Sequence, residues 1–132
     1  MLAVMITKLA WIALGGGCGA VARYALAGWS QRLSAGAFPV GTLAVNVLGC
    51  LVIGLLGAFF AGPQLVREEY RTALLVGFVG AFTTFSTFGW ETLTLANAGE
   101  FRLALANVVL SNGFGLLAVW LGFRLGERWF GV

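Results

Sequence analysis

Residues Gly77 to Glu91 read GFVGAFTTFSTFGWE, and this stretch decides the fold. Apolar sequence surrounds it, so it lies at the centre of a hydrophobic segment rather than in a surface loop. Its glycines weaken a helix, and its hydroxyl side chains offer the backbone alternative hydrogen-bond partners. We therefore predict a helix that breaks between Gly80 and Thr84 and then restarts, with Thr83 or Thr84 capping the second half.

A break at this depth in a membrane leaves backbone groups unpaired. Hydrocarbon tolerates such groups only where they are buried against protein, line a wet cavity or hold an ion. Polar residues then continue along one helical face, at steps of three, four and three: Thr84, Thr87, Glu91 and Thr94. A break followed by a polar stripe indicates a protein that handles ions.

The composition places the whole chain in a bilayer. Of its 132 residues, 60% are hydrophobic and 10% are charged, whereas a soluble domain carries about 25% charged residues. One helical span needs about 20 apolar residues, so the chain has room for four. We predict an all-α membrane protein, a single domain over residues 1–132, with spans at about 9–26, 41–61, 70–97 and 101–126.

Several functional classes are disfavoured by what the chain contains. It has no histidine, no aspartate and no paired nucleophile and base, so we do not expect an enzyme. Cys18 and Cys50 lie in apolar runs without metal-ligand spacing, and we interpret them as packing thiols. The isoelectric point is about 9.4, but the basic residues are scattered, which favours membrane orientation over nucleic-acid binding.

The first two spans each carry one strongly polar side chain, and each of these has two interpretations. Arg23 either reaches the membrane interface or faces a partner helix or an aqueous vestibule. Asn46 has Thr42 one turn before it on the same face. An amide in a membrane helix either forms an interhelical hydrogen bond or donates a hydrogen bond to a solute that passes through the protein. Between these spans, residues 29–36 are expected to form an interfacial loop.

The third and fourth spans carry the remaining candidates. Phe85 and Phe88 lie beside the polar stripe. They are either contacts with the protein core or lipid, or neighbours of an ion path. Glu91 is the only acid within a predicted span, so it is a functional candidate, or else a structural partner for a hydroxyl group or for Arg23. Asn107 and Ser111 follow at a step of four. Small residues at regular spacing in the first and fourth spans predict close helix packing.

The distribution of basic residues gives only a weak orientation preference. Four spans place the N-terminus, the turn at 62–69 and the C-terminus on one side. That side has five basic residues, which are Lys8, Arg67, Arg71, Arg124 and Arg128. The other side has three, which are Arg23, Arg32 and Arg102. Because four spans do not easily bury four polar faces alone, we predict an antiparallel homodimer of dual topology, with two breaks facing each other.

Four segments resemble the Fluc (CrcB) family of fluoride-specific ion channels, over almost the whole chain. They are GAVARY at 19–24, GTLAVNVLG at 41–49, GFVGAFTTFSTF at 77–88 followed by Glu91, and LSNGFGLLAVWLG at 110–122. The resemblance implies a passive channel of the bacterial inner membrane that exports toxic cytoplasmic fluoride. It also implies an antiparallel dual-topology homodimer with two fluoride pores and a structural sodium ion (Na⁺) at its centre.

The resemblance assigns roles to individual residues. It implies that carbonyl groups of Gly80 and Thr83 from both subunits hold the sodium ion. The implied fluoride pore comprises Asn46, Phe85, Phe88, Thr84, Thr87, Glu91 and Ser111, with Arg23 and Thr42 on further recurring positions. The chain departs from the family pattern at Gly89, where serine is frequent, and at Asn107, where an aromatic residue is common.

Two other functions remain as alternatives. A small proton-coupled multidrug exporter also pairs four-span chains, but it relies on a carboxylate in its first span, and this first span has none. A non-conducting membrane assembly subunit would explain the small-residue ridges but not the break or the polar stripe. Fluoride conduction accounts for both, because a strongly hydrated anion needs many donors to replace its water.

Overall fold

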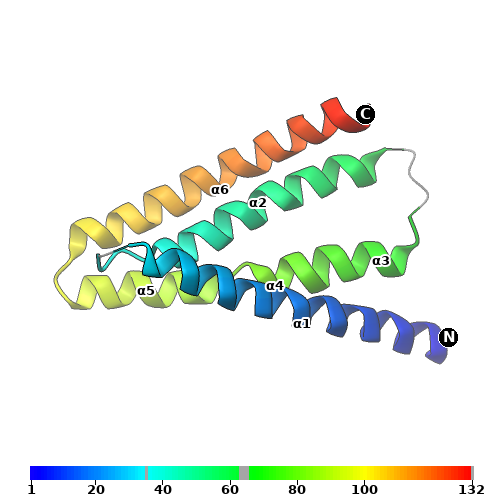
Figure 1. The fold of residues 1–132 in the computed structure, drawn as a ribbon, viewed down its shortest axis with the longest axis horizontal. Coiled ribbons are helices and arrows are strands. Elements are labelled where there is room, and N and C mark those ends of the chain that lie inside the picture. The colour runs from blue at the N-terminus through cyan, green and yellow to red at the C-terminus, as the bar shows by residue number, and fades with distance from the viewer. Residues whose placement is uncertain (35, 63–65, 132) are drawn as a thin grey trace.

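The computed structural model describes residues 1–34, 36–62 and 66–131. Every regular element in these ranges is helical, and four segments, the third of them broken, are long and apolar enough to cross a membrane. This confirms the predicted all-α chain with four spans. The elements in chain order are α1 (Leu2–Arg32), α2 (Val40–Ala61), α3 (Glu68–Thr72), η1 (Ala73–Val79), α4 (Gly80–Phe82), α5 (Phe85–Asn97) and α6 (Phe101–Phe130). Figure 1 labels the six α elements, and η1 lies between α3 and α4.

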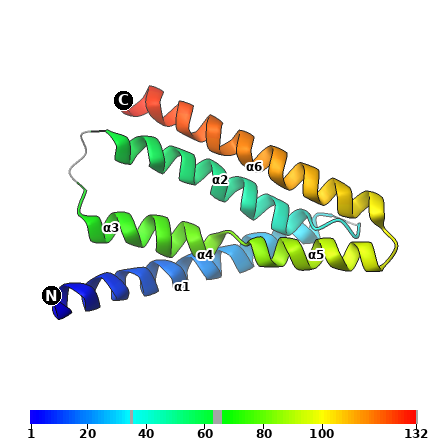
Figure 2. The same ribbon diagram turned by 180° about the vertical axis from the view of Figure 1, so that it is seen from behind.

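The four spans form an antiparallel bundle with both chain termini at the same end (Figures 1 and 2). The α2 helix packs along α6, whereas α1 packs along η1 and α4. The α5 helix packs against α6. The third span therefore begins against α1 and ends against α6, and the change of partner falls at its break.

The break itself is confirmed. The helix ends at Phe82, and the next two residues are extended, with φ −91° and ψ 162° at Thr83 and φ −153° and ψ 112° at Thr84. The α5 helix begins at Phe85, and Thr84 caps it by accepting a hydrogen bond from the Thr87 N–H. Before the break the span is wound as a π-helix over Ala73–Val79, a feature that the sequence analysis did not predict.

Close packing through glycine brings the π-helix against α1. A Cβ atom added at Gly19 would collide with the backbone carbonyl of Phe78, and one at Gly77 would lie 2.8 Å from the carbonyl oxygen of Ile12. The small residues Gly115, Ala118, Gly122 and Gly126 are likewise buried along α6. Both predicted small-residue ridges are confirmed, and both allow backbones to approach closely.

The expected loop at residues 29–36 is wrong in its first half, because α1 continues through Arg32. The side chain of Gln31 explains the extension. Its Nε2 donates to the Phe38 carbonyl at 3.1 Å, and its Oε1 accepts from the Gly41 N–H at 3.0 Å. The last turn of α1 thus holds the start of α2, and the connection is shorter than expected. Residues 63–65 of the predicted turn at 62–69 lie outside the described residues.

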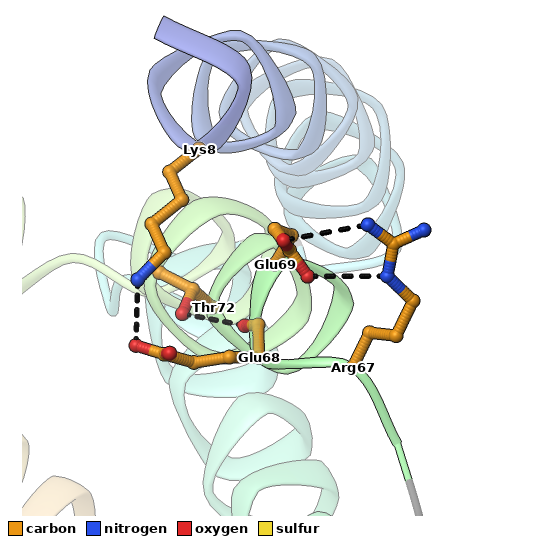
Figure 3. A network of polar contacts seen from close by, with 5 residues as sticks. All are labelled: Lys8, Arg67, Glu68, Glu69 and Thr72. Carbon is orange, nitrogen blue, oxygen red and sulfur yellow. Dashed lines mark hydrogen bonds and ion pairs between the residues drawn. The ribbon is translucent and has the colours of Figure 1, made fainter. Parts of the chain in front are cut away.

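A charged cluster marks the end of the bundle that carries the termini (Figure 3). Lys8 Nζ lies 2.8 Å from Glu68 Oε1, Arg67 Nε lies 3.4 Å from Glu69 Oε2, and the Thr72 hydroxyl donates to the Glu68 carbonyl at 2.8 Å. Exposed pairs of this kind contribute about 0–1 kcal/mol each. The Lys8–Glu68 pair connects α1 to the start of the third span, whereas the Arg67–Glu69 pair lies within that start, and neither pair determines the fold.

Candidate ion site at the helix break

Asn46 replaces the helical hydrogen bonds that the break removes. Its Oδ1 accepts from the Thr84 N–H at 2.8 Å, and its Nδ2 donates to the Thr84 carbonyl at 3.0 Å. The amide therefore pairs both polar backbone groups of Thr84, as a neighbouring strand would. Because an amide nitrogen carries two protons, one remains for another acceptor. The interhelical bond and the role as a donor are thus compatible in one side chain.

The carbonyl groups of Gly80 and Thr83 are among those that lose their helical donors at the break. In a continuous helix, the N–H groups of Thr84 and Thr87 would donate to Gly80 and Thr83, but here they donate to Asn46 and to the Thr84 hydroxyl. The Thr83 carbonyl accepts one bond, at 3.3 Å, from Arg23 Nη1. Freed carbonyls at a helix break are typical sodium ligands. Among the described residues no cluster of three His, Cys, Asp or Glu side chains could hold a metal.

A cavity of about 340 Å³ opens beside the break. It is lined by residues from α2, the third span and α6, most of them apolar. The structure brings seven of the predicted site residues to its wall: Asn46, Gly80, Thr83, Thr84, Phe85, Phe88 and Ser111. The wall also includes Cys50 and Asn112, which the sequence analysis did not assign to a site.

The two phenylalanines of the cavity differ in exposure. Their ring centroids lie 5.3 Å apart with the planes inclined at 44°. Phe88 is 8% exposed, whereas Phe85, on the first turn of α5, is 80% exposed. One ring is therefore packed within this chain, and the other lies on its surface at the edge of the cavity.

Hydroxyl groups cluster around the start of α5. The Thr84 hydroxyl lies 2.9 Å from Thr87 Oγ1 and 3.3 Å from Ser86 Oγ. Ser86 was not among the predicted site residues, although it stands inside the quoted stretch. Thr84 lines the cavity, and the other two hydroxyl groups extend from it along the exposed side of α5.

Glu91 lies beside a second cavity, of about 420 Å³. Its Oε1 accepts a hydrogen bond of 2.7 Å from the Thr42 hydroxyl, while its buried Oε2 has no hydrogen-bond partner among the described residues. Glu91 and Thr42 are thus brought together, but they do not share the first cavity with Asn46. Arg23 lines neither cavity and reaches the break from α1.

Sequence reasoning missed the polar contact between α5 and α6. Asn107 is fully buried, and its Nδ2 donates to the Thr92 hydroxyl at 2.9 Å. The Ser111 hydroxyl in turn donates to Asn107 Oδ1 at 3.2 Å. The signal was present, because an asparagine within an apolar run needs a partner, but nothing in the sequence identified Thr92 as that partner.

Comparisons with known proteins agree with this architecture. The family model described as CrcB-like protein, Camphor Resistance (CrcB) matches residues 10–123. A protein of Symbiobacterium thermophilum named fluoride-specific ion channel FluC 2 is 45% identical, over 92% of this chain and 98% of its own length. Proteins named fluoride-specific ion channel FluC from Magnetococcus marinus and Geobacter metallireducens are each 47% identical, over 91% and 94% of this chain and 98% and 99% of their own.

These names describe ion channels rather than enzymes, as expected from the absence of a nucleophile and base pair. The matched region covers most of the first and fourth spans, the whole of the second span and of the broken third span, and every residue that lines the cavity beside the break. The chain has four spans and a helix break whose backbone is paired by an asparagine. Because the family model also matches it almost from end to end, this protein belongs to the CrcB-like family.

Proposed function

We propose that this chain forms a fluoride channel, which conducts the anion passively and selectively. The observation that carries the proposal is the cavity beside the break, where two phenylalanine rings share a wall with the Asn46 amide and with hydroxyl groups. Relatives of 44–47% identity that carry the name fluoride-specific ion channel support the same conclusion.

The cavity wall suits a small, strongly hydrated anion. A pore must replace the water around fluoride with oriented donors, and Asn46 retains one amide proton after pairing with Thr84. The edge of a phenylalanine ring is positive, so Phe85 and Phe88 can contact the anion edge-on. No lysine or arginine of the described residues lines this cavity, which avoids a fixed cation that would retain fluoride too tightly.

The working channel in this proposal is an antiparallel homodimer of dual topology with two pores. Three observations support it. The basic residues divide only five to three between the two sides. Phe85 is 80% exposed in the single chain, and the cavity beside the break is not fully enclosed by this chain. An inverted second copy would cover that ring and close each cavity into a pore.

The proposed dimer also contains a structural sodium ion at its centre. The carbonyl groups of Gly80 and Thr83 fit this role, because their helical donors are diverted to other acceptors. A carbonyl oxygen has two lone pairs, so Thr83 can hold a cation and still accept from Arg23. When bound, the ion would neutralise these carbonyls and join the two subunits. In this proposal each chain contributes its Gly80 and Thr83 carbonyls, and the partner copy completes the coordination of the ion.

Passive conduction in the bacterial inner membrane is sufficient for fluoride resistance. In acid surroundings fluoride crosses membranes as neutral HF, ionises in the cytoplasm and is trapped there. A potential that is negative inside drives the anion out through a selective pore. No coupling ion is required, which distinguishes the proposal from a proton-coupled multidrug exporter.

The phenylalanine pair provides the test. Replacing Phe85 or Phe88 by isoleucine removes the positive ring edge but keeps an apolar side chain, so each variant is expected to lose most fluoride flux from proteoliposomes while remaining dimeric. The control is Phe101→Ile, because Phe101 is exposed at the start of α6 and lines neither cavity. Unchanged flux in both pore variants would place the pathway elsewhere. Flux that follows a pH gradient rather than the membrane potential would favour a proton-coupled carrier.

A further inference from the structure

A chain of hydrogen bonds runs from the cavity wall into the contact between α5 and α6. Ser111 lines the cavity, and its hydroxyl donates to Asn107 Oδ1 at 3.2 Å. Asn107 Nδ2 donates to the Thr92 hydroxyl at 2.9 Å, which donates to the Phe88 carbonyl at 2.8 Å. Asn107, at the middle of this chain, is 0% exposed. Its two partners therefore account for the polar contacts of a fully buried amide.

The direction of each bond follows from the last acceptor. A carbonyl oxygen only accepts, so the single hydroxyl proton of Thr92 is used on Phe88. Towards Asn107 the Thr92 oxygen can then only accept, which orients the amide with its NH₂ group towards Thr92 and its oxygen towards Ser111. Because an amide oxygen also only accepts, Ser111 must donate its proton to Asn107.

This arrangement determines what Ser111 offers to an anion. Its only proton is directed away from the cavity, and the lone pairs of its oxygen remain on the other side. An anion at the Ser111 wall gains a donor only if the hydroxyl rotates and gives up its bond to Asn107. Each entry of an anion into this position is therefore opposed by one hydrogen bond.

We propose that Asn107 is a positioning residue that weakens anion binding by holding the Ser111 proton away from the cavity, with Thr92 fixing the orientation of the amide. This inference rests on the proposed fluoride channel and adds a determinant of its affinity. Weak binding has a use, because conduction requires that an ion can leave as readily as it enters. Asn107 then acts through Ser111 and does not contact the anion.

Two variants release the Ser111 proton by different routes. Asn107→Leu has a similar volume and removes the acceptor. Thr92→Val removes the oxygen that orients the amide, so the NH₂ group can turn towards Ser111 and make it the acceptor. Flux is measured over a range of fluoride concentrations with the full-length protein. In either variant, the half-saturating fluoride concentration is expected to be about twofold to tenfold lower than in the wild type, which corresponds to the free energy of one hydrogen bond.

The matched control is Thr72→Val, because the Thr72 hydroxyl also donates to a carbonyl four residues before it on the third span, at 2.8 Å, and lines neither cavity. Its half-saturating concentration should match the wild type. In a Ser111→Ala background the shifts caused by Asn107→Leu and Thr92→Val should disappear, since both act through the Ser111 proton. A purely structural role would lower the flux without tightening the affinity.

The outcomes separate this inference from the proposed function. A conducting wild type whose two variants show unchanged or weaker affinity would overturn the inference alone, as would a shift that persists in the Ser111→Ala background. A wild-type protein that moves no fluoride would overturn the proposed channel and this inference with it. If Asn107→Leu fails to fold, Thr92→Val decides the question, because it leaves Asn107 in place.

Discussion

Replacing Asn46 by leucine is expected to abolish fluoride flux and to destabilise the protein. The change leaves the N–H and the carbonyl of Thr84 without the partners that lie at 2.8 Å and 3.0 Å. Each buried polar group left unpaired costs about 1–3 kcal/mol, so the free energy of unfolding should fall by about 2–6 kcal/mol. Thermal unfolding in detergent and fluoride flux from liposomes measure the two effects.

Two further variants isolate the cause. Asn46→Asp keeps an acceptor for the Thr84 N–H, but when ionised it cannot donate to the carbonyl and it repels an anion, so flux should fall with a smaller loss of stability. Asn112→Leu removes an amide that donates to a carbonyl of its own helix at 2.7 Å, and it should change the melting temperature little. A stable Asn46→Leu protein would contradict the assigned pairing.

Replacing Gly19 by alanine is expected to separate α1 from the π-helix. The added methyl group would collide with the backbone carbonyl of Phe78, which cannot move aside as a flexible side chain would. Overpacking of this kind costs about 1–3 kcal/mol, although alanine is intrinsically the better helix former by about 1 kcal/mol. The melting temperature should therefore fall. Flux should fall too, because Phe78 lies only five residues before the break.

Gly17 provides the matched control on the same helix. A Cβ atom there meets nothing within 4 Å, so Gly17→Ala should leave stability unchanged or raise it. The sign of the change in melting temperature thus distinguishes close packing from helix propensity. Equal effects at the two positions would show that the contact between α1 and the π-helix is looser than described.

The break could be predicted from sequence because its cause is local. Gly80 and the hydroxyl residues that follow it disfavour a continuous helix, and Thr84 is a good N-cap. The π-helix over Ala73–Val79 has no such local signal. It lies against the glycines of α1, so we attribute it to tertiary packing, which a single sequence does not reveal.

The candidate site was only partly predictable for a related reason. Helical counting gives the face on which a residue lies but not which neighbour meets it. Glu91 shares a face with Thr84, yet seven residues separate them, which is about 10 Å along a helix, and it lies beside a different cavity. The contact of Asn107 with Thr92 depends on how α6 packs against α5, so only the structure identifies it.

The most direct test of the account is a measurement of anion selectivity. The purified wild-type protein is placed in liposomes loaded with fluoride and chloride together, and a potassium ionophore permits charge-balancing efflux. We predict rapid release of fluoride, detected with a fluoride electrode, while chloride stays inside, as in liposomes without protein. Release of chloride at a comparable rate, or retention of both anions, would contradict the proposed fluoride channel.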